Sequence, residues 1–430
     1  MLNRINQLLR SQYDTKYVCL NIAKTAGTSL SQLLMDTYKK KEVYSSYGKA
    51  ATYDRLGHLQ ADYFLEFLTK LRPRHIRRAK IFTGHLPFID KKCYQFPIEY
   101  ILFLRNPIER IISGYTYGMR HQNIPLDFFD YGLHMSCSFE HSTNFSNPIL
   151  QTLLHKTKIN TNDADKIDGL IQSIGFIGIT EAFEYSTQQL LQYLGKSSNK
   201  SYYLNTSNKI KIPHAATIRT IQYRNYYDIL LYNKACESLN SKRLAEGLDP
   251  IPLCDYQQEG PFSSGDYHPT LSCYQAFNHE DDSAWFPNAF LLATPNEYIG
   301  YDFGVNQQRI VRELQLQVLG PDPSIAHYAL EASNDGFVHD VQMLMSFNVP
   351  ISLDNLVHHI PTGITYSARM WRIRRLSDLN NSPLAIATLS FTPEQKAVCK
   401  NAALIQANIS ELSMKFNHET YSRALSDSSC

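Results

Sequence analysis

The 430-residue sequence lacks the patterns that mark several common protein classes. Its eight cysteines are scattered and form no C-x-x-C pair, which argues against a zinc ribbon or a thioredoxin-type site. No run approaches ~18 apolar residues, so no transmembrane segment is expected. The net charge of +2 is too balanced for nucleic acid as the main partner, so any electropositive site must be local.

The first ten residues also lack a hydrophobic stretch long enough for a secretory signal. We therefore expect a cytoplasmic protein with reduced thiols. The composition, 43% hydrophobic and 19% charged, is that of a globular chain rather than a disordered one.

Residues 1–250 alternate short apolar runs with longer helical patterns, which predicts an α/β domain with a parallel sheet covered by helices on both faces. The apolar runs predict strands at 17–22, 81–84, 100–104 and 176–179. Apolar residues at helical spacing predict helices at 28–38, 60–71, 107–118, 148–156, 181–194 and 226–243.

The pattern changes after residue 250. Residues 251–264 are rich in Pro, Gly and Ser and are expected to be a linker. Residues 265–390 carry short alternating runs separated by turn residues, which predicts a β-sandwich. Both tryptophans, Trp285 and Trp371, fall in this second domain.

The tail, residues 391–430, is predicted to be a helix because Thr392 and Pro393 form a helix start. Its apolar residues from Val398 to Phe416 step by four and three, as in a coiled-coil seam. Two interpretations stay open: homo-oligomerisation through this helix, or a helix that docks on its own chain.

The segment after the first predicted strand carries the most informative pattern. The strand stops at a short loop and an amphipathic helix follows, so backbone N–H groups, a lysine and three hydroxyls gather at a helix N-terminus. Such a site favours an anion, phosphate above all. An ordinary strand-to-helix turn is the alternative. The candidate residues are Lys24, Thr25, Ala26, Gly27, Thr28 and Ser29.

Three further residues follow other predicted strands. His85 comes directly after the strand 81–84, at the sheet edge where ligands gather in parallel sheets. Arg105 ends the next strand and can bind phosphate in a bidentate manner, although a structural salt bridge would also explain it. Ser113 lies two turns into the following helix.

Together these motifs resemble the sulfotransferase family that includes the Golgi carbohydrate sulfotransferases and bacterial relatives. The resemblance covers about residues 15–245. It rests on Lys24–Ser29, on Gly84-His85-Leu86-Pro87-Phe88, on the run from Leu104 to Tyr115, on Gly178-Ile179-Thr180-Glu181 and on Asp228 to Tyr232.

The resemblance implies a P-loop-like fold and 3′-phosphoadenosine 5′-phosphosulfate as the sulfuryl donor, with no metal required. The Lys24–Ser29 loop would hold the 5′-phosphosulfate, with Lys24 stabilising the leaving oxygen. Arg105 and Ser113 would hold the 3′-phosphate, and His85 would be the catalytic base, with His58 as the alternative. The acceptor would be a hydroxyl, of a carbohydrate by this resemblance. The sequence departs from the family at Ala23, usually Pro, and at Asn106, often Asp.

Residues 265–390 resemble the discoidin-like, galactose-binding-like domains, which are jelly-roll sandwiches that often bind sugars. The matching segments are 276–285, 298–304, 331–336 and 368–374. Some members hold a structural calcium near an early acidic turn, here Glu280, Asp281 and Asp282, although a solvated turn is the favoured interpretation.

Two rival functions stay open. The first is a P-loop kinase or other NTPase, but the loop lacks the Gly-x-x-x-x-Gly-Lys-Ser/Thr order because Lys24 precedes Gly27. The second is a non-catalytic glycan-binding protein whose first domain has lost its activity. Neither the acceptor nor the ligand of the second domain follows from the sequence.

Overall fold

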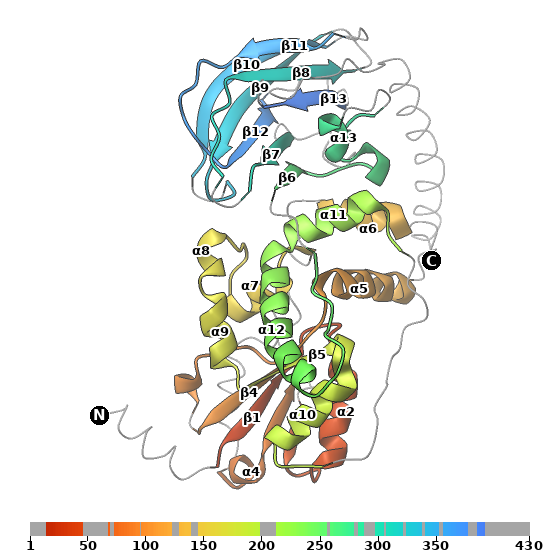
Figure 1. The fold of residues 1–430 in the computed structure, drawn as a ribbon, viewed down its shortest axis with the longest axis vertical. Coiled ribbons are helices and arrows are strands. Elements are labelled where there is room, and N and C mark those ends of the chain that lie inside the picture. The colour runs from red at the N-terminus through yellow and green to blue at the C-terminus, as the bar shows by residue number, and fades with distance from the viewer. Residues whose placement is uncertain are drawn as a thin grey trace, which may run out of the picture. The chain divides into compact units, whose positions relative to one another are not determined.

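A computed structural model of the chain describes most of it. The described residues are 14–45, 68, 73–94, 96–122, 129–138, 145–197, 212–255, 259–278, 283–287, 297–304, 307–320, 324–337, 340–351, 356–376 and 385–391. They divide into two compact units (Figure 1). The first comprises 1–126, 143–212 and 224–256, and the second comprises 127–142, 213–223 and 257–430.

The first unit is built on a five-stranded parallel sheet, which confirms the α/β prediction. The strand order is β2-β3-β1-β4-β5, and every neighbouring pair is parallel. The strands are β1 (Lys16–Leu20), β2 (Val43–Ser45), β3 (Ile81–Gly84), β4 (Ile98–Leu104) and β5 (Phe176–Ile179). The carboxyl ends of all five strands therefore lie at the same edge of the sheet, where the candidate residues are expected.

Helices cover both faces of this sheet, because successive strand residues point to opposite sides. Cys19 packs with α2 (Gly27–Thr37) and α10 (Phe183–Tyr193) on one face. Val18 packs on the other face. The helices of that second face are α4 (Pro73–Arg78), α7 (Pro148–Leu154), α9 (Ile167–Ser173) and α12 (Tyr226–Ala245). The first unit also contains α5 (Pro107–His121) and α8 (Thr161–Ala164).

The second unit is an antiparallel β-sandwich, as the alternating runs predicted. One sheet has the order β10-β9-β12-β7-β6 and the other the order β11-β8-β13. Trp371 is fully buried in the core between them. The strands are β6 (Gly260–Ser263), β7 (Tyr298–Asp302), β8 (Glu313–Leu319), β9 (Ser324–Ser333), β10 (Gln342–Ile351), β11 (His358–Pro361), β12 (Met370–Arg375) and β13 (Ala385–Ser390).

Three helices accompany the sandwich: α6 (Phe129–Ser138), α11 (Ala215–Arg224) and the short α13 (Tyr274–Phe277). Two of them, α6 and α11, come from within the range 1–250 that the sequence assigned to the first domain. His134 of α6 explains the attachment, because its Nε2 lies 3.1 Å from Oδ2 of Asp266 and its Nδ1 lies 3.0 Å from Oγ1 of Thr217. The range 251–264, which was expected to be a linker, contains strand β6. This segment forms a strand because it pairs with β7.

Some expectations fall outside the described residues: the helix at 60–71 apart from Leu68, the alternative base His58, the acidic turn 280–282 and the C-terminal helix after residue 391. In the part of the chain that the structure describes, no helix is both long enough and apolar enough to cross a membrane. Within that same part, no group of three or more His, Cys, Asp or Glu residues is arranged to hold a metal ion.

Candidate functional site

The loop after β1 has a backbone suited to receive an anion. Lys24 and Ala26 both adopt left-handed backbone conformations, with φ of 69° and 61°. Non-glycine residues occupy this region rarely, at a cost of about 1–3 kcal/mol where it is strained. Ala26 is the N-cap of α2 and its side chain makes no capping hydrogen bond. The first N–H groups of α2 are therefore not capped by the N-cap side chain, and they carry the positive end of the helix dipole.

The hydroxyl groups of this loop differ in accessibility. Thr28 is exposed in the first turn of α2, whereas Ser29 is buried. Thr25 is also buried, and its Oγ1 donates a hydrogen bond of 2.9 Å to the Ile22 carbonyl. Thr25 thus closes the loop on itself and helps hold its strained backbone.

Gly27, at the start of α2, lies close to the side chain of Asn21. A Cβ at this position would lie 3.1 Å from Cγ of Asn21, closer than side chains ordinarily pack. The loop is therefore held against the end of β1, and a larger residue at position 27 would push the two apart.

Lys24 and Arg105 come from separate motifs, and the structure brings them together. Nη1 of Arg105 lies 3.5 Å from the main-chain oxygen of Lys24, and its Nη2 lies 3.6 Å from Oε2 of Glu109. The half-buried Lys24 places its ammonium 4.1 Å from the centre of the Tyr117 ring. Burial is the main cause that lowers the pKa of Lys24, and the charges of Arg105 and Arg120 lower it further. Such a concentration of positive charge favours an anionic ligand.

Arg105 is placed by the junction between β4 and α5. Oδ1 of Asn106 accepts the N–H groups of Ile108 at 3.0 Å and of Glu109 at 3.3 Å, and Pro107 occupies the first turn. Asn106 therefore caps α5 as an aspartate would, and its departure from the family pattern keeps the helix start intact. Ser113 lies two turns further along α5 and is buried.

His85 lies at the same edge of the sheet, directly after β3. Its Nδ1 is 2.8 Å from the main-chain oxygen of Asn21, the residue directly after β1. A carbonyl oxygen can only accept a hydrogen bond, so Nδ1 carries the proton. In the neutral imidazole the lone pair then lies on Nε2, the atom that can accept a proton from a substrate.

A cluster of three buried polar side chains next to the loop, those of Asn21, Ser31 and Thr83, was not predicted from the sequence. Nδ2 of Asn21 lies 3.1 Å from Oγ of Ser31 and 3.3 Å from Oγ1 of Thr83. The two hydroxyl oxygens lie 3.1 Å apart. The available signal was a polar residue inside or next to an apolar run, as at Thr83 in Ile81–Gly84.

Two of the motifs that carry the sulfotransferase resemblance, at Asp228 and at Thr180-Glu181, make hydrogen bonds that hold other elements in place. Asp228 is fully buried and accepts the N–H groups of Ile149 at 2.9 Å and Leu150 at 2.8 Å, so it caps α7. Burial raises its pKa to about 6. Thr180 donates to the Leu104 carbonyl at 2.9 Å, and Glu181 accepts the N–H of Asn106 at 2.9 Å. These residues support the site and do not form it.

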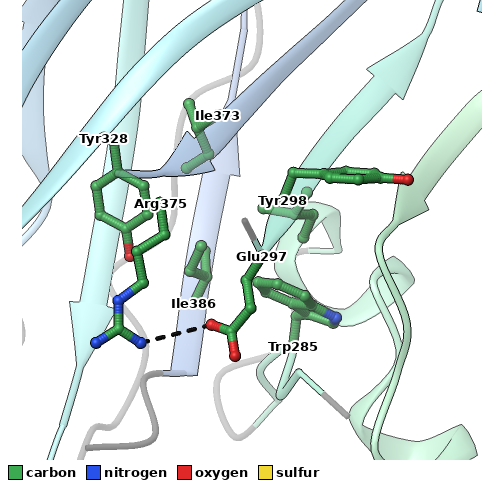
Figure 2. Close-up of a pocket in the computed structure, with 8 residues that line it drawn as sticks. Trp285, Glu297, Tyr298, Tyr328, Ile373, Arg375 and Ile386 are labelled. Atoms are coloured by element: carbon green, nitrogen blue, oxygen red, sulfur yellow. Dashed lines mark ion pairs between the residues drawn. The ribbon is translucent and has the colours of Figure 1, made fainter. Parts of the chain in front are cut away.

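The second unit contains a small pocket between its sheets (Figure 2). Its walls include the rings of Trp285, Tyr298 and Tyr328 together with an ion pair of 3.5 Å between Arg375 and Glu297. Its empty volume is about 240 Å³ when the open solvent at its mouth is included. Because the side chains of both charged residues are only 5% exposed, the pocket belongs to the sandwich core.

Comparisons with known proteins assign no family to the chain. No known protein family matches the sequence. No curated protein matches it either.

Solved structures match about a third of the chain. A family 32 carbohydrate-binding module of Clostridium perfringens NanJ, solved with galactose, is 13% identical with a TM-score of 0.25, over 31% of this chain and 91% of its own. A chitosan-binding module from a Paenibacillus chitosanase/glucanase is 13% identical with a TM-score of 0.25, over 31% and 92%. A pectin-binding module is 13% identical with a TM-score of 0.26, over 32% and 93%. At these values the matches carry no argument about the ligand of this chain.

Proposed function

We propose that the first unit is a sulfotransferase that uses 3′-phosphoadenosine 5′-phosphosulfate. The observation that supports this most is the position of Lys24, Arg105 and His85, which all follow strands at one edge of the parallel sheet. They follow β1, β4 and β3, which are neighbours in the sheet. The residues that the resemblance names for donor binding and proton transfer therefore follow neighbouring strands, although up to 81 positions separate them in the chain.

The proposed reaction is an in-line transfer of the sulfuryl group. The acceptor oxygen forms a bond to sulfur while the bond between sulfur and the 5′-phosphate oxygen breaks. Negative charge grows on that leaving oxygen, and the ammonium of Lys24 together with the N–H groups at the start of α2 would stabilise it. The acceptor proton would pass to Nε2 of His85, a form of catalysis typically worth ~10²–10⁴-fold.

Arg105 is the residue proposed to hold the 3′-phosphate. Its guanidinium is fixed between the Lys24 carbonyl and Glu109, and a planar fork of donors suits a phosphate. Ser113 would add a hydroxyl from α5. The two phosphate ends of the donor would then be held by separate elements, α2 and α5.

The deciding experiment is calorimetric titration with adenosine 3′,5′-bisphosphate, the desulfated donor. Wild-type protein should bind it, and Lys24→Ala and Arg105→Ala should bind it more weakly. Lys91→Ala is the matched control, because Lys91 pairs with Glu99 at 2.6 Å near the start of β4 and away from the proposed site. Failure of the wild type to bind the nucleotide would overturn the proposal. Hydrolysis of labelled ATP would instead support the NTPase alternative.

We further propose a carbohydrate as the hydroxyl acceptor, with the sandwich as a glycan-binding module. The support is the sequence resemblance and the observed sandwich; the modules named above bind their own sugars, and that fact only guides the choice of library. Full-length protein should bind members of a glycan array equally well with and without Lys24→Ala. Transfer of labelled sulfate onto the bound glycans, read by mass spectrometry, would identify the acceptor. An array without any bound glycan would reject the role of the sandwich.

A further inference from the structure

We infer that Asn21 is a positioning residue that fixes the tautomer and the orientation of His85. It joins the end of β1 to β3 and to α2 through both its main chain and its buried side chain. The chemical consequence of this arrangement rests on the proposed function, because it concerns the base of the transfer reaction. The structural consequence, one defined tautomer of His85, does not.

The main chain of Asn21 makes hydrogen bonds to both Gly84 and His85. Its N–H donates to the Gly84 carbonyl at 3.1 Å, which continues the pairing of β1 with β3 by one residue. Its carbonyl oxygen then lies 2.8 Å from Nδ1 of His85. Since both bonds come from one residue, any rotation of the Asn21 peptide groups would disturb the histidine.

The side chain of Asn21 holds that backbone in place. The amide nitrogen of Asn21 and the hydroxyls of Ser31 and Thr83 form a triangle with sides of 3.1, 3.3 and 3.1 Å. All three residues are less than 5% exposed. Buried polar groups of this kind are costly to leave without hydrogen bonds, so the triangle resists distortion.

Gly27, at the start of α2, packs against the side chain of Asn21. The side chain of Asn21 lies so near the start of α2 that a Cβ on Gly27 would approach its Cγ to 3.1 Å. Asn21 therefore lies next to the loop Lys24–Ser29 on one side and next to His85 on the other. A shift in the loop would be passed to the histidine through Asn21.

The fixed tautomer matters because only one nitrogen of a neutral imidazole accepts a proton. With Nδ1–H held on the Asn21 carbonyl, Nε2 is the basic atom. If that bond were lost, the proton could reside on Nε2, and this nitrogen would no longer act as a base. Orientation contributes in the same direction, since a misplacement of about 1 Å at a catalytic group can cost ~10²-fold in rate.

The test is to read the His85 tautomer directly by ¹⁵N NMR on histidine-labelled full-length protein, with His85→Gln used to assign the signals. At about pH 9, above the ordinary titration range of histidine, wild-type protein should show only the tautomer protonated on Nδ1. Asn21→Ser and the nearly isosteric Thr83→Val should show a mixture of tautomers. Thr116→Val is the control, because this equally buried hydroxyl donates to the Ile112 carbonyl within α5.

Kinetics give the second readout. We expect kcat to fall about 10–100-fold in Asn21→Ser, a larger loss than any loss of affinity for adenosine 3′,5′-bisphosphate. A tautomer that stays on Nδ1 in both variants would overturn the inference, and so would an equal loss of kcat and nucleotide affinity. If Asn21→Ser does not fold, Thr83→Val decides. If wild-type protein binds no nucleotide, the proposed function fails while the tautomer result still decides the role of Asn21.

Discussion

The ammonium of Lys24 lies over the ring of Tyr117, 4.1 Å from its centre, and so links the loop after β1 to α5. Tyr117 is 54% exposed, so the pair sits at the surface end of the site. The charged state of Lys24 is weakened there, because burial and the nearby Arg105 and Arg120 all lower its pKa. Under the proposed function, nucleotide binding should therefore weaken at alkaline pH.

The first prediction concerns that sensitivity. The affinity for adenosine 3′,5′-bisphosphate should fall as pH rises above neutral, because Lys24 loses its proton at a lower pH than an ordinary lysine. Lys24→Arg keeps its charge throughout this range and should retain binding at pH 9–10. Titration calorimetry from pH 7 to 10 measures both. Parallel pH dependence in the two proteins would show that Lys24 does not contact the ligand.

The second prediction concerns the base. His85→Ala should lower kcat by about 10²–10⁴-fold, because general base catalysis is typically worth that factor. The affinity for the desulfated nucleotide should stay close to that of the wild type. His58→Ala is the matched comparison, and a larger loss in that variant would transfer the role of base to His58. Initial rates and nucleotide titration on each variant separate these outcomes.

The third prediction separates the two ends of the donor. Arg105→Ala should weaken adenosine 3′,5′-bisphosphate binding by about 10–100-fold, since hydrogen bonds to a charged group contribute about 1.5–3 kcal/mol. Binding of adenosine 5′-phosphate, which lacks the 3′-phosphate, should not change. Arg105→Lys should recover only part of the loss because a lysine cannot form the bidentate contact. An equal loss for both nucleotides would place Arg105 elsewhere in the site.

The fourth prediction concerns the cap of α7. Asp228→Ala leaves two buried N–H groups, of Ile149 and Leu150, without their acceptor, and each costs about 1–3 kcal/mol. Burial raises the pKa of Asp228 to about 6 in the folded protein, above its value near 4 in an unfolded chain. The folded state therefore favours the protonated carboxyl, and this contribution is full below pH 4 and lost as pH rises through 6. The cost of Asp228→Ala, from urea unfolding, should be larger at pH 4 than at pH 7.5.

The fifth prediction concerns the buried histidine of the second unit. Asp266→Ala should destabilise this unit by about 2–6 kcal/mol, because it leaves the buried Nε2 of His134 and the Nε1–H of Trp285 without their partner, at about 1–3 kcal/mol each. Its carboxylate also accepts Nε1–H of Trp285 at 2.9 Å. Trp285→Phe removes that bond together with part of the buried indole ring system, and should cost about 1–3 kcal/mol. Thermal unfolding compares the two variants, and equal costs would show that the His134 contact contributes little.

The regular elements were predictable because their signals are local. Alternation of apolar runs with helical patterns predicted four of the five strands of the parallel sheet, and β2, with three residues, was too short to stand out. The sandwich followed from short runs with turn signals. Helices α6 and α11 were not assigned to the second unit, because their attachment depends on His134 and its partners far away in the chain.

The candidate site was predictable in part. Lys24, Arg105 and His85 each follow a strand, and this pattern can be read from the sequence alone. The role of Asn21 could not be read, because it arises from pairing between β1 and β3 and from the approach of Gly27. The left-handed backbone conformations of Lys24 and Ala26 could not be predicted from the sequence either, because neither residue type favours them.

The division of the chain into two units has a consequence for synthesis. The chain changes unit after residues 126, 142, 212, 223 and 256, so neither unit is a continuous stretch. His134 leaves the ribosome 132 residues before its partner Asp266, a wait of roughly 7–26 s at 5–20 residues per second. During that interval α6 has no sandwich to bury its histidine. The second unit can close only after nearly the whole chain has been made, and a gene cut at codon 250 would leave α6 and α11 permanently without their sheet.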